Sequence, residues 1–197
     1  MDTSFWIKFA LSFLVGGVWV TLSSIAAERF GSKVGGLIGG LPSTIVVTLL
    51  FIGLTQTAER AAESAVIVPL VMGLNGIFVT VFILLSRRGL APALAGALLT
   101  WFSLASLLIV VNIRALWISL LGWLLLAVGC FLLVEKGLRI VSQGRKAARY
   151  TASQIAGRAA LAGTVVAFAV LMSKVAGPLA GGIFATFPAV FLSNLII

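Results

Sequence analysis

The stretch that decides the fold is GSKVGGLIGGLPSTIVVTLLF, residues 31–51. Most of its residues are apolar, and it is as long as the roughly 20 residues that a helix needs to cross a bilayer. Pro42 stands near its middle, and a proline removes a backbone donor and clashes with the preceding helical turn. The stretch therefore predicts a membrane-spanning helix that is broken near the centre of the bilayer.

The same design returns 146 positions later as GPLAGGIFATFPAVFLSNLII, residues 177–197. Aligned without gaps, the matching residues are Gly31, Gly35, Gly36, Pro42 and Leu49 in the first copy and Gly177, Gly181, Gly182, Pro188 and Leu195 in the second. The preceding segments align at the same offset, with Gly17 on Gly163. We interpret this pattern as a duplicated core that contains two proline-broken helices.

Composition places the whole chain in a membrane. Of its 197 residues 61% are hydrophobic and only 10% are charged, and the mean hydropathy is +1.21. Apolar residues lie on every face of each predicted helix. The alternation of apolar and polar residues that is typical of a β-barrel is absent. We expect an all-α, polytopic integral membrane protein that forms a single transmembrane domain over residues 1–197.

Seven apolar runs are long enough for transmembrane helices, at residues 5–27, 34–54, 65–85, 90–111, 115–134, 154–173 and 178–197. Repeat 1 covers about residues 9–54, the central helices residues 65–134, a basic loop residues 135–153, and repeat 2 about residues 155–197. The last run stops at Ile197 without a polar anchor, so we expect the native chain to continue.

The basic residues predict the orientation in the membrane. Ten Lys and Arg residues lie on one side of the predicted spans, with Arg158 counted at the edge of that side, and four lie on the other. By the positive-inside rule the N-terminus is outside and the C-terminus is cytoplasmic. The net charge of +9 therefore indicates lipid headgroups rather than nucleic acid as a partner.

The basic loop at residues 135–153 is the most strongly charged segment on the cytoplasmic side. We expect it to lie along the inner leaflet and to contact anionic lipid headgroups. The residues in this predicted lipid contact are Arg139, Arg145, Lys146 and Arg149. On the outer side, Arg60 and Glu63 are expected to form a solvated ion pair.

Four predicted spans lie between the two broken segments, so these segments cross the membrane in opposite directions and the predicted repeat is inverted. Pro42 lies about 16 Å along a helix from Gly31, about half of the hydrocarbon core. Both breaks should therefore lie near the midplane, where inverted repeats of transporters place their substrate site. The alternative is that both prolines only kink helices whose freed carbonyls are covered by neighbours.

The predicted substrate site combines the residues around the breaks with one amide from the central helices. Its members are Gly39, Gly40, Pro42, Ser43, Thr44, Thr186, Pro188 and Asn75. The breaks should leave carbonyls such as those of Phe184 and Ala185 without helical partners and should direct helix N-termini inward, which favours an anionic or neutral polar solute. For the glycines and for Asn75, close helix packing is the alternative reading.

Glu28 and Lys174 occupy equivalent repeat positions just before the two broken segments, and both are candidate gate residues or interfacial anchors. Cys130 is the one cysteine and the chain has no histidine, so we predict no metal site and no cofactor. No paired carboxylates and no nucleophile with a base are visible, so we predict no enzymatic activity.

The paired GG-x5-P segments, Gly35-Gly36 to Pro42 and Gly181-Gly182 to Pro188, resemble the GlpM-like family of small uncharacterised prokaryotic inner-membrane proteins. The resemblance covers little more than these two segments. It implies a multi-pass protein of a prokaryotic inner (plasma) membrane and no established activity.

The sequence thus predicts a small membrane transporter or facilitator. Two alternatives stay open: a lipid-interacting translocation protein or lipid enzyme, and an accessory or channel subunit without transport of its own. The sequence also leaves open whether the chain forms a homo-oligomer.

Overall fold

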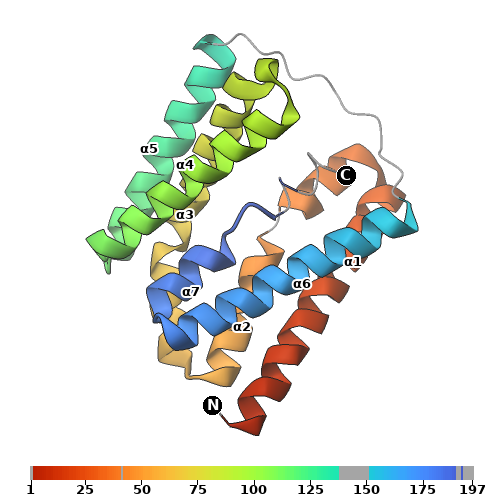
Figure 1. Cartoon of the computed structure of the whole chain (residues 1–197), viewed down its shortest axis with the longest axis vertical. Coiled ribbons are helices and arrows are strands. Elements are labelled where there is room, and N and C mark those ends of the chain that lie inside the picture. The colour runs from red at the N-terminus through yellow and green to blue at the C-terminus, as the bar shows by residue number, and fades with distance from the viewer. Residues whose placement is uncertain (1, 41, 138–150, 190–191, 193–197) are drawn as a thin grey trace. The chain divides into compact units, whose positions relative to one another are not determined.

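A computed structural model of the chain describes residues 2–40, 42–137, 151–189 and 192, without the side chains of residues 24, 27–40 and 43 (Figure 1). These residues form helices and turns, and no strand occurs among them. The elements are α1 (Thr3–Gly40), α2 (Ser43–Thr55), α3 (Ala58–Leu85), the 3₁₀ turn η1 (Ser86–Arg88), α4 (Leu90–Val111), α5 (Leu116–Leu132), the π-helical turn η2 (Leu133–Gly137), α6 (Ala152–Val175) and α7 (Pro178–Ala185). The all-α prediction is confirmed.

Five segments within the described residues are long and apolar enough to cross a membrane: Thr3–Ser23, Ala58–Arg88, Leu90–Val111, Leu116–Gly137 and Ala152–Val175. α2 has 13 residues and α7 has 8, fewer than the roughly 20 of a full span. The chain therefore has the build of a membrane protein, and the count of seven spans stays a prediction.

Helix α1 differs from the expected pair of helices at residues 5–27 and 34–54. It continues through the expected loop and ends only at Gly40. Glu28, Arg29 and Lys33 carry charges typical of a loop in a membrane protein, but they are also acceptable helix formers. Without a proline in this stretch nothing stops the helix before Pro42, which disfavours the helical conformation of the residue before it.

Both prolines of the repeated pattern open a new helical turn. The N–H of Val46 donates to the carbonyl of Pro42 at 3.1 Å, and the N–H of Leu192 donates to the carbonyl of Pro188 at 2.8 Å. The preceding helices end at Gly40 and Ala185. Of these two prolines, only Pro42 is followed by a helix within the described residues, α2, and at the start of a helix the missing N–H of proline costs no helical hydrogen bond.

The chain forms two compact units. The terminal unit comprises Met1–Ser64 and Gln143–Ile197, and the central unit comprises Ala65–Ser142, so that the boundary falls inside α3. The two predicted repeats thus belong to one unit and the central helices to the other. The expectation of one transmembrane domain stays a prediction.

Helix α6 organises the terminal unit, because it packs against α1, α2 and α7 (Figure 1). α2 also packs against α1 and α7. The core of the unit consists of Phe5, Val47, Phe51, Ile52, Val166 and Val170. Segments from both ends of the chain therefore bury one common core.

Glycines bring the backbones of α1 and α6 into contact. A Cβ atom at Gly17 would lie 3.1 Å from the carbonyl oxygen of Ala159, and one at Gly163 would lie 2.5 Å from the carbonyl oxygen of Phe13. As the position on α1 advances from Phe13 to Gly17, its partner on α6 retreats from Gly163 to Ala159. The two helices therefore run antiparallel.

In the central unit, glycines of α3 face α5. A Cβ atom at Gly73 would lie 3.3 Å from the Cα of Trp123, and one at Gly76 would lie 3.3 Å from the Sγ of Cys130. The partners advance in the same direction along both helices, so α3 and α5 run parallel. Small residues at the contact let the two helices approach closely.

Candidate functional site

The first predicted break is formed by the end of α1 and the start of α2. Gly39 and Gly40 are the last residues of α1, and Pro42 precedes α2 with φ −75° and ψ 51°. Pro42 is exposed and Thr44 is half-buried, whereas the side chain of Ser43 lies outside the described residues. No side chain caps the N-terminus of α2.

The second break is buried. Thr186 is 3% exposed and Pro188 less than 2%. The hydroxyl of Thr186 donates to the carbonyl of Ile183 at 2.7 Å, and the N–H of Phe187 donates to the carbonyl of Phe184 at 3.2 Å. The carbonyl of Phe184 has no usual helical partner, because the residue four positions later is Pro188, and the tightened last turn of α7 supplies the N–H of Phe187 instead.

The glycine pair before this break has a packing role. A Cβ atom at Gly181 would collide with the Cβ of Ser173 in α6 and would lie 3.1 Å from the Cδ1 of Ile52 in α2. Gly181 therefore lets α7 approach both neighbouring helices. Gly35 is the equivalent residue of the first repeat. It belongs to α1, but its packing lies outside what the structure describes.

Asn75 belongs to the central unit, whereas the other predicted substrate residues belong to the terminal unit. Its side-chain oxygen accepts a hydrogen bond of 3.0 Å from the indole N–H of Trp101, which is 1% exposed. This bond joins α3 to α4. It is the contact that the helix-packing alternative for Asn75 predicts.

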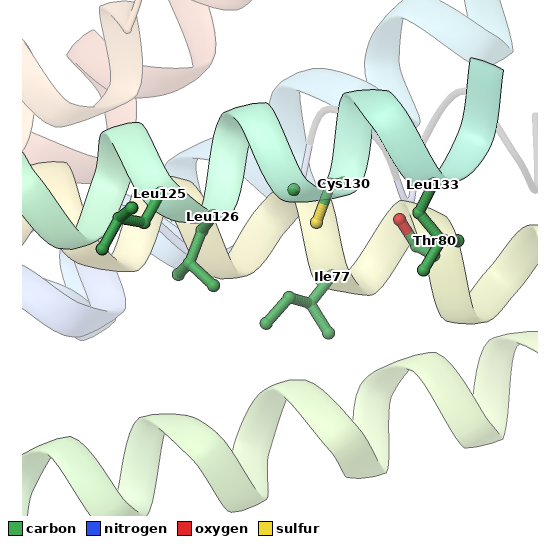
Figure 2. A pocket seen from close by; sticks show the side chains of 7 residues that line it. Ile77, Thr80, Leu125, Leu126, Cys130 and Leu133 are labelled. Atoms are coloured by element: carbon green, nitrogen blue, oxygen red, sulfur yellow. The ribbon is translucent and has the colours of Figure 1, made fainter. Parts of the chain in front are cut away.

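A cavity of about 250 Å³ lies between α3 and α5 in the central unit (Figure 2). Its lining residues are Ile77, Thr80, Leu125, Leu126, Gly129, Cys130 and Leu133. The hydroxyl of Thr80 donates to the carbonyl of Gly76 at 2.8 Å, so the cavity offers hydrocarbon and a thiol rather than polar recognition groups. None of the predicted substrate residues lines it.

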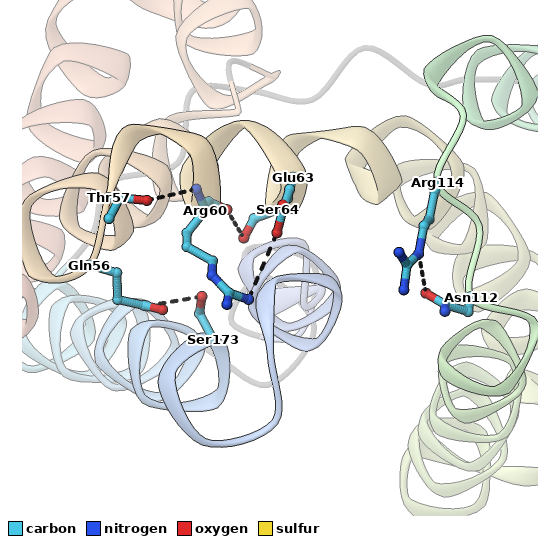
Figure 3. A network of polar contacts seen from close by, with 8 residues as sticks. All are labelled: Gln56, Thr57, Arg60, Glu63, Ser64, Asn112, Arg114 and Ser173. Atoms are coloured by element: carbon cyan, nitrogen blue, oxygen red, sulfur yellow. Dashed lines mark hydrogen bonds and ion pairs between the residues drawn. The ribbon is translucent and has the colours of Figure 1, made fainter.

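Polar contacts tie the helices of the terminal unit together near the end of α2 (Figure 3). The amide of Gln56 donates to the hydroxyl of Ser173 at 3.0 Å, which links the end of α2 to α6. The ammonium of Lys8 donates to the carbonyl of Leu54 at 2.7 Å, which links α1 to the end of α2.

The predicted ion pair between Arg60 and Glu63 is present at 3.8 Å (Figure 3). Their side chains are 52% and 62% exposed, so the pair is the solvated one that the sequence predicts. An exposed pair of this kind contributes little to stability, about 0–1 kcal/mol.

The remaining predicted residues lie at the surface or beyond the described residues. Lys174 is exposed in the last turn of α6. The side chain of Glu28 and the lipid-contact residues Arg139, Arg145, Lys146 and Arg149 lie outside the described residues.

Arg158, which the sequence predicts at the edge of a span, is largely buried. In α6 its side chain is only 9% exposed. It shares a helical face with Ala162, Val165 and Ala169, all buried, because these residues follow at intervals of three to four. This run of small and branched apolar residues is the sequence signal that could have predicted its burial.

Arg158 is also the only charged side chain that is buried among the described residues. Four buried hydroxyls of the terminal unit donate to carbonyls of their own helix turns, in Ser12, Thr48, Ser64 and Thr186. These four are thus used in local structure, and the buried hydroxyl of Ser173 accepts from Gln56. The described residues also contain no group of His, Cys, Asp and Glu that could hold a metal ion.

A comparison with protein families identifies a family whose model matches most of the chain. A family model described as "Protein of unknown function (DUF3147)" matches residues 9–115 and 158–197, and these two segments include both proline breaks. No curated protein and no solved structure matches the chain. The likeness to the GlpM-like family stays a prediction.

Proposed function

Because the chain belongs to the DUF3147 family of proteins of unknown function, which assigns it no activity, we propose from its architecture that it is a small membrane transporter or facilitator. The solute site lies in the terminal unit, between the two proline breaks. The solute is anionic or neutral and polar. The protein moves it without chemical change.

The observation that carries this proposal is the reciprocity of the contacts between α1 and α6. Gly17 meets the backbone of Ala159, and Gly163 meets the backbone of Phe13. A shift of 146 positions converts each contact into the other, because Gly17 corresponds to Gly163 and Phe13 to Ala159. The helices α1 and α6 run antiparallel. Two repeats related by a two-fold axis in the plane of the membrane require this direction, whereas repeats related by an axis along the membrane normal would place α1 and α6 parallel.

The helix breaks support the same relation. Pro42 and Pro188 are 146 positions apart, and each opens a new helical turn. Inverted repeats with discontinuous helices are typical of secondary transporters, whose two similar halves exchange conformations. In this arrangement Pro42, Thr44, Thr186 and Pro188 approach one site from opposite faces of the membrane.

The orientation follows from the basic residues. The N-terminus is outside, the C-terminus is cytoplasmic, and the loop at residues 135–153 contacts anionic lipid headgroups of the inner leaflet. The membrane is a prokaryotic inner membrane, as the likeness to the GlpM-like family implies.

Reconstitution into liposomes tests the proposal. Purified full-length protein is reconstituted, and uptake is measured for a panel of inorganic anions, organic acids, neutral polar solutes and fluorescent lipids. We expect saturable movement of one class of small solutes, absent from protein-free liposomes. If the protein moved the fluorescent lipids and none of the solutes, its function would be lipid translocation instead. Folded protein that moves neither solutes nor lipid would contradict it and favour an accessory subunit.

A further inference from the structure

Arg158 has a costly position for a charged side chain. It lies six residues into the candidate span Ala152–Val175, about 9 Å along the helix from its first residue. The side chain is 9% exposed, and the next residue, Ala159, touches Gly17 of α1. Arg158 therefore lies at the level where α1 and α6 meet. Charges inside membrane-spanning segments are rare, and by default they indicate a functional site.

The equivalent position in the other repeat carries no charge. The residue 146 positions earlier is Ser12 in α1, which is fully buried and donates to the carbonyl of Phe9 at 2.7 Å. The same place in the other repeat is thus filled by a short hydroxyl side chain. The long cation is therefore present in only one of the two repeats.

The chemistry of the guanidinium selects the ligand. It carries a positive charge and five N–H donors in a planar fork that matches a carboxylate or a phosphate. With five donors it can hold a neighbouring group and still bind two oxygens of an anion. The buried hydroxyls of the same unit lack both the charge and the fork.

We infer that Arg158 binds the anionic group of the transported solute, a carboxylate or a phosphate. The substrate part of this inference rests on the proposed transport function, whereas anion binding by Arg158 is independent of it. Binding should stabilise the folded state by mass action.

Thermal unfolding of the purified full-length protein in detergent measures this binding. Inorganic phosphate and acetate are added in the low-millimolar range at ionic strength held constant with chloride. We expect one of the two anions to raise the melting temperature of the wild-type protein, and we expect Arg158→Gln to abolish the rise. Lys174→Gln is the matched control, because it removes an exposed cation from the same helix and should leave the rise intact.

Arg158→Lys separates anion recognition from folding. Lysine keeps the charge but loses the fork, so half of the maximal rise should require about tenfold more anion, the effect of losing one charge-assisted hydrogen bond. A wild-type protein that responds to neither anion would overturn the inference without any variant. An Arg158→Gln or Arg158→Lys protein that responds like the wild type would overturn it as well.

Flux in liposomes distinguishes this inference from the proposed function. If an anion stabilised the protein through Arg158 but did not cross the membrane, the inference of an anion-binding site would stand and the proposed transport function would be contradicted. If a neutral solute showed saturable flux that Arg158→Gln did not change, the proposed transport function would stand and the proposed role of Arg158 would be contradicted.

Discussion

Gly163 lies so close to the carbonyl oxygen of Phe13 that a Cβ atom would stand 2.5 Å from it. That distance is far below van der Waals contact, and the obstructing atom belongs to a backbone. Gly163→Ala should therefore force α1 and α6 apart and lower the free energy of unfolding by about 1–3 kcal/mol, the usual cost of overpacking. Thermal unfolding in detergent measures the loss.

Gly129 in α5 is the control for this substitution, because a Cβ atom there would have no neighbour within 4 Å. Gly129→Ala should leave the melting temperature unchanged or raise it, since alanine favours a helix over glycine by up to about 1 kcal/mol. If both variants melted alike, the backbones of α1 and α6 would not be in contact at Gly163.

The hydrogen bond between Trp101 and Asn75 should stabilise the central unit. Trp101→Phe keeps the aromatic bulk but removes the donor, and Asn75→Leu removes the acceptor. Because hydrogen bonds between membrane helices contribute about 0.6–2 kcal/mol, a double-mutant cycle should show a coupling free energy in this range. Zero coupling would mean that the bond contributes nothing. If the Asn75→Leu protein folded but was inactive, the result would favour a role for Asn75 in substrate binding.

The features that the sequence predicts well are those that neighbouring residues determine, such as helix ends and helix lengths. Pro42 and Pro188 disfavour a helical conformation of the residue before them, so both breaks could be proposed from the chain alone, although Pro69 is accommodated inside α3. Apolar length likewise predicts α3 to α6 to within a few residues, except for the start of α3, which reaches outward to Ala58. The continuity of α1 through Glu28 and Lys33 was missed because these residues suit both a polar loop and a helix.

Long-range packing decides the rest and is not readable from local patterns. Nothing near Asn75 in the sequence indicates Trp101 as its partner. The small and branched residues that follow Arg158 indicate a buried face of α6, but they do not indicate which helices pack against α6. The carbonyl of Phe184 finds its partner through a tightened last turn, a geometry that the proline alone does not specify.

Gln56 and Ser173 provide a distance test of the terminal unit, because their side chains are hydrogen-bonded at 3.0 Å although 117 positions separate them. Cysteines at both positions, in a Cys130→Ser background, should be joined by a short bifunctional thiol reagent. Mass spectrometry should then find one linker bridging the two peptides. Thr164 faces outward on α6, so a pair of cysteines at Gln56 and Thr164 should each carry a separate linker. Equal bridging of both pairs would contradict the packing of α2 against α6.

Glu59 and Arg88 lie at opposite ends of the candidate span Ala58–Arg88 and test the orientation. The basic residues predict that Glu59 is outside and Arg88 cytoplasmic. In a Cys130→Ser background, a membrane-impermeant thiol reagent added to intact cells should modify a cysteine at Glu59 and spare one at Arg88. The reverse pattern would invert the proposed topology.

The hydroxyl of Thr186 is the sharpest test of a site at the breaks, because its removal should cost function more than folding. The carbonyl of Ile183 that it bonds also accepts the N–H of Thr186 at 3.1 Å, so Thr186→Val leaves that carbonyl with a partner. Its loss of stability should therefore stay near 1 kcal/mol.

With the transported solute identified, Thr44→Val and Thr186→Val should slow its movement, since both positions flank a break. Thr100→Val is the matched control: its hydroxyl also donates within its own helix, to the carbonyl of Gly96 at 2.8 Å, but α4 belongs to the central unit and has no break. Melting temperatures separate a folding defect from a transport defect in each variant. If all three variants folded and transported equally, the hydroxyls at the breaks would serve their helices alone, and the solute site would have to be sought around Arg158 without them.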